Sequence, residues 1–183
     1  MEKEIEIINK DNCIFKRCNK NTYTLQFEIE NENIYLSKII DFSLIKLIYD
    51  LNPDIYEKFD FQKINENEGI SIMLIKHFFE DLGLPQRYSF IHIQKIIEEK
   101  QILFKSTTIH SEKPSIIPKS AEILSIENLT CICDLITPHK ILFSLNIDFE
   151  SGFNIPLFAE KMIGIIIHKI FKRIKQFIEN LHI

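Results

Sequence analysis

Hydrophobic and polar residues alternate along much of this chain, and the alternation is strict over residues 22–30, where Tyr23, Leu25, Phe27 and Ile29 share one face. Successive strand residues point to opposite faces, so this pattern predicts a strand with one buried and one solvated face. The same period of two predicts further strands over residues 4–8, 12–18, 61–64, 70–79, 88–98, 102–109, 121–134 and 141–149.

Three stretches follow helical spacing instead. Leu36–Leu51 places apolar residues three and four positions apart, and Asn52 and Pro53 should end that helix. A second short helix is expected over Asp54–Phe59. A longer pattern runs from residue 156 to 181 without an internal proline, which corresponds to a helix of roughly 35–40 Å at 1.5 Å per residue.

The order of these elements indicates the fold class. Strands come first, two short helices interrupt them, more strands follow, and the long helix ends the pattern. Strand runs with helices set apart are typical of α+β folds with an antiparallel sheet. We therefore predict a helix-grip fold, a curved antiparallel sheet wrapped around the C-terminal helix with two short helices between early strands, built as one domain over residues 1–183. A helix this broad should leave a tunnel above the sheet.

Composition and charge exclude several function classes. The net charge of −4 argues against general nucleic-acid binding, which needs a basic surplus. No apolar run is long enough to span a membrane, the first residues carry no signal-peptide core, and the four cysteines lack zinc spacing. Free thiols suit a reducing compartment, so we expect a cytoplasmic protein without a metal or another cofactor. The chain lacks a nucleophile elbow and a glycine-rich phosphate loop, and we expect that it is not an enzyme.

Four short blocks narrow the fold further. They occur in order and with compatible spacing at Asp50–Asp54, Leu84–Tyr88, Pro114–Glu122, and Ile147 to Pro156, the last with Asp148 and Gly152. Together they resemble the blocks of START domains, the lipid-transfer module related to the steroidogenic acute regulatory protein. The resemblance covers about residues 36–181. It implies a protein that holds one lipid in an internal hydrophobic cavity and carries it between membranes.

The sequence departs from the family pattern at two informative positions. Some sterol-binding members place a buried acid on one central strand and an arginine on the next, and by spacing these positions fall on Met73 and His92. The first block also has Leu51 where the family has tryptophan. The resemblance therefore leaves the ligand open between a phospholipid and a sterol.

Candidate ligand contacts are the residues that share faces with these two positions and those in the first turns of the long helix. A lipid cavity needs apolar walls and a few polar groups, so the proposed contacts are Met73, Ile75, His77, Tyr88, Phe90, His92, Gln94, Phe158, Met162 and Ile166. The resemblance implies a gate formed by the loop 79–85, with Phe79, Leu82 and Leu84, and by the start of the helix. The alternative for the histidines is an ordinary strand position, and for the helix it is plain core packing.

Membrane contact and partners follow from the same resemblance. We expect a monomer that touches membranes transiently and binds no nucleic acid. The helix also carries Lys161, Lys169, Lys172, Arg173 and Lys175, which form either a solvated face or a docking face for anionic membrane.

Two other functions stay open. An inward cluster of His77, His92 and a carboxylate would favour a helix-grip enzyme or a chaperone for a small molecule such as a quinone or polyketide. A cavity below about 300 Å³ would favour an interaction module whose interior is filled by side chains.

Overall fold

Ten strands form one sheet in the computed structural model, which describes residues 4–182. Their order is β1-β2-β3-β10-β9-β7-β6-β5-β4, and each neighbouring pair on this path is antiparallel. The tenth strand, β8, pairs in parallel with the start of β6. The bounds are β1 Ile5–Lys10, β2 Cys13–Arg17, β3 Thr22–Glu30, β4 Tyr56–Asn65, β5 Glu68–Ile75, β6 Arg87–Ile97, β7 Gln101–Thr108, β8 Glu122–Ile123, β9 Ile126–Thr137 and β10 Lys140–Phe149.

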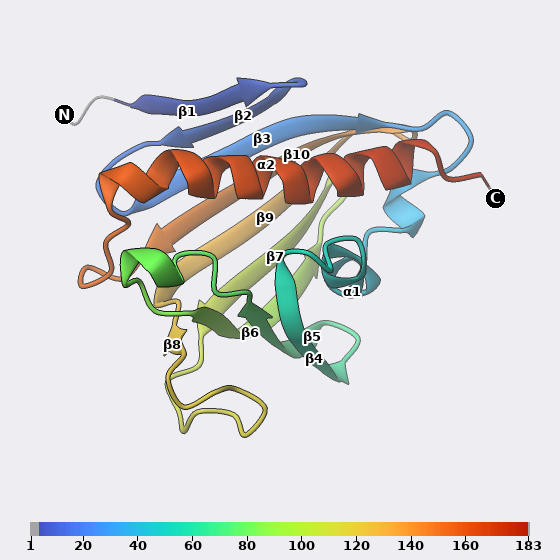
Figure 1. Cartoon of the computed structure of the whole chain (residues 1–183). Helices are drawn as coiled ribbons and strands as arrows, with labels where there is room; N and C mark the ends of the chain where they lie inside the picture. Colours follow the sequence, from blue (N-terminus) through green and yellow to red (C-terminus); the bar gives the residue numbers. More distant parts are fainter. Residues whose placement is uncertain (1–3, 183) are drawn as a thin grey trace.

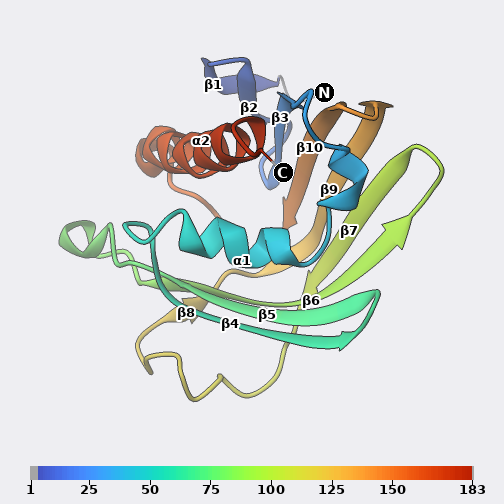
Figure 2. The ribbon, with the colours of Figure 1, turned by 90° about the vertical axis from the view of Figure 1, so that its right-hand side faces the viewer.

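The sheet curves around its helices. The long helix α2 (Leu157–Glu179) lies across the concave face, above β3 and β10 (Figure 1). The short helix α1 (Ser43–Asp50) lies inside the same curve, between α2 and strands β4 to β6 (Figure 2). The predicted helix-grip architecture is therefore confirmed. Within residues 4–182, no helix is both long enough and apolar enough to cross a bilayer.

The main core forms where β3 meets the second half of α2. Tyr23, Leu25, Phe27 and Ile29, the alternating residues of β3, are all buried, as the pattern predicts. Ile170, Ile174 and Ile178 of α2 belong to the same cluster, because residues four apart on a helix share a face. This half of α2 is ordinary core.

The two predicted short helices differ from the observed elements. The stretch 36–51 splits into a 3₁₀ turn, η1 (Leu36–Lys38), and α1, because the Asp41 carboxylate accepts the Ser43 N–H at 2.7 Å and starts a new helix there. The predicted helix over Asp54–Phe59 is wrong, since β4 begins at Tyr56. Pairing with β5 and stacking of Phe59 on Tyr49 of α1, with ring centroids 5.1 Å apart, outweigh the local helical pattern.

Two predicted strands are also shorter or divided. The strand expected over 70–79 ends at Ile75, and the strand expected over 121–134 becomes β8 and β9. Thr108 explains the division, because its Oγ1 accepts the Ile126 N–H at 2.9 Å and donates to the Leu124 carbonyl at 3.3 Å. The chain thus pairs with β6 through β8, turns away, and then pairs with β10 as β9.

Candidate functional site

The concave face of the sheet has two differently packed parts. On the β3 side it is filled by the second half of α2, where the Phe27 and Phe171 rings lie 5.8 Å apart. α1 lies between this half of α2 and the sheet. The first half of α2 lies over the middle of the sheet without α1 beneath it (Figures 1 and 2). The inward side chains there are only half-buried: Met73, Ile75, Ile91, Leu129 and Ile147.

The strand register corrects the predicted ligand contacts on β6. Met73 pairs with Ser89, whereas Leu74 pairs with Tyr88, so the inward residues of β6 are the odd-numbered ones. Tyr88 and Phe90 pack on the opposite, convex face, with Ile72, Leu74, Ile117 and Ala121.

His92 and Gln94 also belong to the convex face, by the same alternation. The prediction that they share a cavity wall with Met73 is therefore wrong. Ser89 and Ile91 take their place on the concave face. Periodicity alone could not identify this parity, because β6 is apolar on both faces.

His77 lies outside the sheet and holds a loop together. β5 ends at Ile75, and the exposed His77 ring places Nε2 2.6 Å from the Leu84 carbonyl oxygen. The predicted role of His77 as a cavity wall is thus wrong. Its hydrogen bond instead closes the loop that contains the 3₁₀ turn η2 (Glu80–Leu82) and Gly83, whose φ of +70° suits glycine.

We expect His77→Ala to loosen this loop without unfolding the protein. The variant loses the bond to the Leu84 carbonyl, while the side chain that it removes is exposed. Amide hydrogen exchange over residues 78–84 should become faster by about three- to tenfold, as expected for one lost hydrogen bond. Exchange in β9 is the internal control and should not change. Unaltered exchange over 78–84 would contradict this role for His77.

Exposed apolar side chains gather on the η2 loop and on the first half of α2. Phe158 is 61% exposed and Leu82 is 53% exposed. Both views place η2 on the same side of the molecule as the start of α2 (Figures 1 and 2). We call this set the apolar rim, and its members are Phe78, Leu82, Leu157, Phe158, Met162 and Ile165.

The rim corrects two further predicted contacts. Phe158 and Met162 point to solvent and so do not line the concave face, whereas the predicted Ile166 is half-buried against the main core. Among the predicted loop residues Leu82 is exposed, and Phe79 and Leu84 are half-buried. Sequence reasoning missed Phe78, Leu157 and Ile165, although a helix that is apolar on more than one face is a signal for such exposure.

The first half of α2 is anchored by a buried carboxylate. Glu160 accepts a hydrogen bond from the Tyr23 hydroxyl at 3.0 Å and pairs with Arg17 Nε at 3.1 Å. Burial and the adjacent carboxylate raise the pKa of Tyr23 to about 12, so its hydroxyl stays protonated. One turn later Gly164 lies against Ile7, where an added Cβ would come within 2.8 Å. The helix start is therefore held on β1, β2 and β3.

The second half of α2 is anchored at the turn after α1. Asp54 accepts hydrogen bonds from Arg173 at 2.5 Å and from Lys169 at 2.5 Å, and Arg173 also donates to Asn52 Oδ1 at 3.0 Å. Lys172 pairs with Asp11. Lys175 pairs with Glu179. Four of the five basic residues on α2 are thus engaged in ion pairs, which favours the solvated face over an anionic docking face.

Asp54 should make stability depend on pH in the acid range. The Arg173 guanidinium, followed by the Lys169 ammonium, holds the pKa of Asp54 well below its ordinary value. A carboxyl with a depressed folded-state pKa stabilises the fold above its unfolded pKa of about 3.9 and loses that contribution as pH falls below it. In urea titrations, we expect Asp54→Asn to lower stability at neutral pH and to flatten the loss of stability below about pH 4. Asp60→Asn, an exposed aspartate on β4, is the control, and equal curves for both variants would contradict this assignment.

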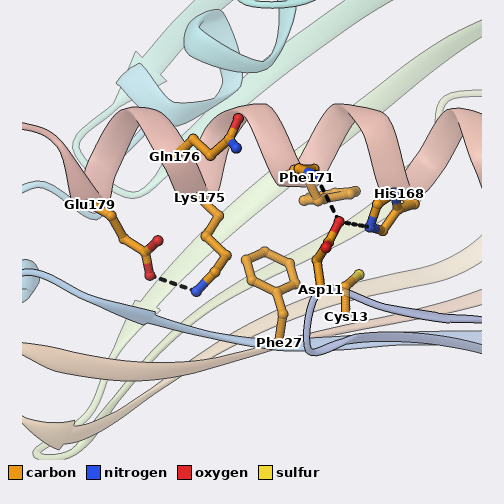
Figure 3. Close-up of a pocket in the computed structure, with 9 residues that line it drawn as sticks. Asp11, Cys13, Phe27, His168, Phe171, Lys175, Gln176 and Glu179 are labelled. Atoms are coloured by element: carbon orange, nitrogen blue, oxygen red, sulfur yellow. Dashed lines mark hydrogen bonds and ion pairs between the residues drawn. The ribbon is translucent and has the colours of Figure 1, made fainter.

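A small pocket lies between the β1–β2 turn and α2. It measures about 220 Å³, and Figure 3 shows Asp11 reaching from the turn toward His168 and Phe171 of the helix. Asp11 Oδ2 lies 2.7 Å from Lys172 Nζ and 3.3 Å from His168 Nε2. Two ion pairs, Asp11 with Lys172 and Lys175 with Glu179, lie in its wall, and the volume is below the roughly 300 Å³ of ordinary ligand sites. This pocket does not suit a lipid.

A wider groove of about 740 Å³ opens at the end of the sheet where α2 begins. Arg87 pairs there with Glu122 at 2.8 Å and lies over the Phe153 ring at 5.2 Å from its centroid. Lys113 donates to backbone carbonyls, and His110 pairs with Glu150. The groove is polar and its charges are balanced, so it differs from the apolar concave face.

Comparison with known proteins identifies the fold. No family model matches the sequence, and no curated protein gives a significant match. Solved structures do match.

The lipid transfer and protein localization domain of human StarD13 superposes with a TM-score of 0.71 and 12% identity, over 99% of this chain and 91% of that one. Human STARD10 gives 0.66 at 7% identity, over 93% and 72%. A STAR-related lipid transfer protein of Xanthomonas axonopodis gives 0.62 at 9% identity, over 94% of each chain. The chain therefore has the helix-grip fold of START-related lipid transfer domains.

Proposed function

We propose that this protein binds one lipid between the concave face of the sheet and the first half of α2, and carries it between membranes. The observation that carries the proposal is the half-buried apolar surface formed by Met73, Ile91, Leu129 and Ile147 beneath that half of the helix. Covering such a surface with an apolar ligand is favourable by roughly 25 cal/mol per Å². The shared fold with lipid transfer domains supports the same conclusion.

The apolar rim is the proposed point of membrane contact. Its side chains are exposed on η2 and on the start of α2, and contiguous exposed apolar residues commonly mark interaction surfaces. Glu160 and Gly164 hold the helix on the sheet, whereas the η2 loop is closed by the exposed His77 side chain and by the hydrogen bond from Leu84 N–H to the Phe79 carbonyl. The η2 loop is therefore the element that opens, and the start of α2 is the fixed side of the entrance.

The geometry gives less support to the other functions. A helix-grip enzyme or a small-molecule chaperone would gain support from inward histidines, but His77 lies on an exposed loop and His92 on the convex face. An interaction module with a filled interior would leave the inward side chains of the sheet buried, and Met73 and Ile91 are not.

Transfer between vesicles tests the proposal. Donor vesicles carrying a fluorescent lipid and a quencher are mixed with unlabelled acceptor vesicles, and the protein should raise the rate at which fluorescence is recovered. Separate donors carry a labelled sterol, diacylglycerol or phospholipid. Protein unfolded with urea is the control. If no lipid in this set moves faster in the presence of the folded protein, the proposed function is wrong.

A further inference from the structure

The concave face carries a ligand preference that the fold alone does not specify. Resting on the proposed function, we infer that the bound lipid is uncharged and that its polar end is a hydroxyl or carbonyl group held near Ser89. Three observations carry this inference: the side chains of the inner surface, the state of the charges around it, and a cluster of hydroxyl groups.

Around Ile91 the inner surface carries only hydroxyl, thiol, thioether and hydrocarbon side chains. By strand register and packing, the inward positions of β5, β6, β7, β9 and β10 there are Ser71, Met73, Ser89, Ile91, Ser106, Thr108, Leu129, Cys131 and Ile147. By the same alternation Arg87, two residues before Ser89 on β6, lies on this face at its border. Burial raises the pKa of the Cys131 thiol, which therefore stays uncharged. A charged head group buried among these residues would lose its hydration and find no unpaired opposite charge, which is strongly unfavourable.

Two charged groups that border this surface, Glu160 and Arg87, already have partners. Glu160 is neutralised by Arg17 and accepts the Tyr23 hydroxyl. At the end of the sheet, Arg87 pairs with Glu122. Using either group for a phosphate or an amine would break an existing ion pair, so neither offers free charge to a ligand.

Hydroxyl groups, by contrast, surround Ile91. Ser71 and Thr108 are its direct neighbours on β5 and β7, and Ser89 lies two residues before it on β6. Diagonal neighbours on adjacent strands are about 7–8 Å apart, within reach of one ligand end. The Thr108 hydroxyl already donates a hydrogen bond to the Leu124 carbonyl and accepts one from the Ile126 N–H.

The two serines keep hydrogen-bonding capacity that the protein does not use. Ser71 Oγ is buried without a hydrogen-bond partner. Ser89 is half-buried, and its hydroxyl forms no hydrogen bond with any other residue in the range 4–182. A hydroxyl both donates and accepts, so Ser89 can bind either a ligand hydroxyl or a ligand carbonyl. Of the two serines, the half-buried Ser89 is the one that a ligand can reach, and the buried Ser71 lies diagonally from it on β5.

A competition between lipids tests this inference. The full chain is incubated with vesicles of phosphatidylcholine and phosphatidylserine that also contain cholesterol and diacylglycerol. It is then separated from the vesicles, and the bound lipids are counted by mass spectrometry. Relative to vesicle composition, cholesterol or diacylglycerol should be enriched at least about tenfold over either phospholipid, because a charged head group lacks a partner inside.

Single substitutions then test the position of the polar end. Ser89→Ala should weaken binding of the preferred neutral lipid by about three- to tenfold, the usual effect of one lost hydrogen bond. The matched control is Ser144→Ala on the convex face of β10, where the hydroxyl oxygen accepts from Gln26 Nε2 at 3.3 Å. That variant should bind the same lipid as tightly as the unmodified protein.

The outcomes separate this inference from the proposed function. Equal or preferred uptake of a phospholipid would overturn the inference and leave lipid binding intact. Uptake of no lipid would overturn both. Selective uptake of a neutral lipid that Ser89→Ala does not weaken would overturn the placement of its polar end.

Discussion

Replacing Leu82 and Phe158 with aspartate should slow vesicle-to-vesicle lipid transfer by at least about a hundredfold while leaving thermal stability unchanged. Burying each of these side chains in a membrane contributes about 1.5–3 kcal/mol, and the double variant loses both contributions. The two residues come from different sides of the proposed entrance, η2 and the start of α2. Both are more than half exposed, so the fold does not depend on them. Transfer rates and melting temperatures provide the two measurements.

The control for this double variant uses exposed apolar residues at the other end of the sheet. Ile97 ends β6 and Ile136 lies near the end of β9, and both are more than half exposed. The double change to aspartate there alters charge and exposed area to a similar extent, yet it lies away from the rim. It should leave transfer within about twofold of the original rate, as for ordinary surface substitutions. Equal losses for the two pairs would show that the rim has no special role.

Arg17→Met should lower the free energy of unfolding by about 3–5 kcal/mol, the largest effect on stability that we expect. The change leaves the Glu160 carboxylate buried beneath α2 without its cation, with only the Tyr23 hydroxyl as a partner. Adding Glu160→Met should restore most of the loss, because an apolar pair of similar size needs no compensating charge. Urea unfolding of the two single variants and the double variant measures these differences.

An exposed ion pair on α1 provides the comparison for the Arg17 and Glu160 variants. Lys46 and Asp50 lie one turn apart and both remain accessible to solvent. Lys46→Met should change stability by less than about 0.5 kcal/mol, since exposed ion pairs contribute little. An equally small effect of Arg17→Met would contradict the proposal that Glu160 anchors the start of α2.

The sequence was most informative where one face of an element is buried and the other is solvated. Residues 22–30 form a strand with the predicted faces because polar residues mark its solvated side. The long helix also begins and ends within two residues of its predicted limits. The break at Asp41 and the conversion of residues 56–59 to a strand depend on one side-chain hydrogen bond and on partners distant in the sequence, and local periodicity records neither.

The candidate site was harder to predict because β6 is apolar on both faces. Its even-numbered residues cover Ile117 and Ala121 in a second cluster, and its odd-numbered residues face the helix. Without the register of β5, a choice between Phe90 and Ile91 is arbitrary. The loop brought a similar difficulty, because His77 continues the alternation of β5 after the strand has ended. Ion pairs across α2, such as Arg17 with Glu160, have no local signal at all.

The central claim is that a lipid lies on the concave face beneath the first half of α2, and a single tryptophan can locate it. The sequence contains no tryptophan, so Met73→Trp and His92→Trp each give one reporter, on the concave and the convex face respectively. The quencher is a spin-labelled form of the lipid that the competition experiment shows to be bound. With it, we expect strong quenching of Met73→Trp fluorescence and almost none of His92→Trp fluorescence. Quenching of the convex reporter alone, or of neither reporter, would contradict the claim.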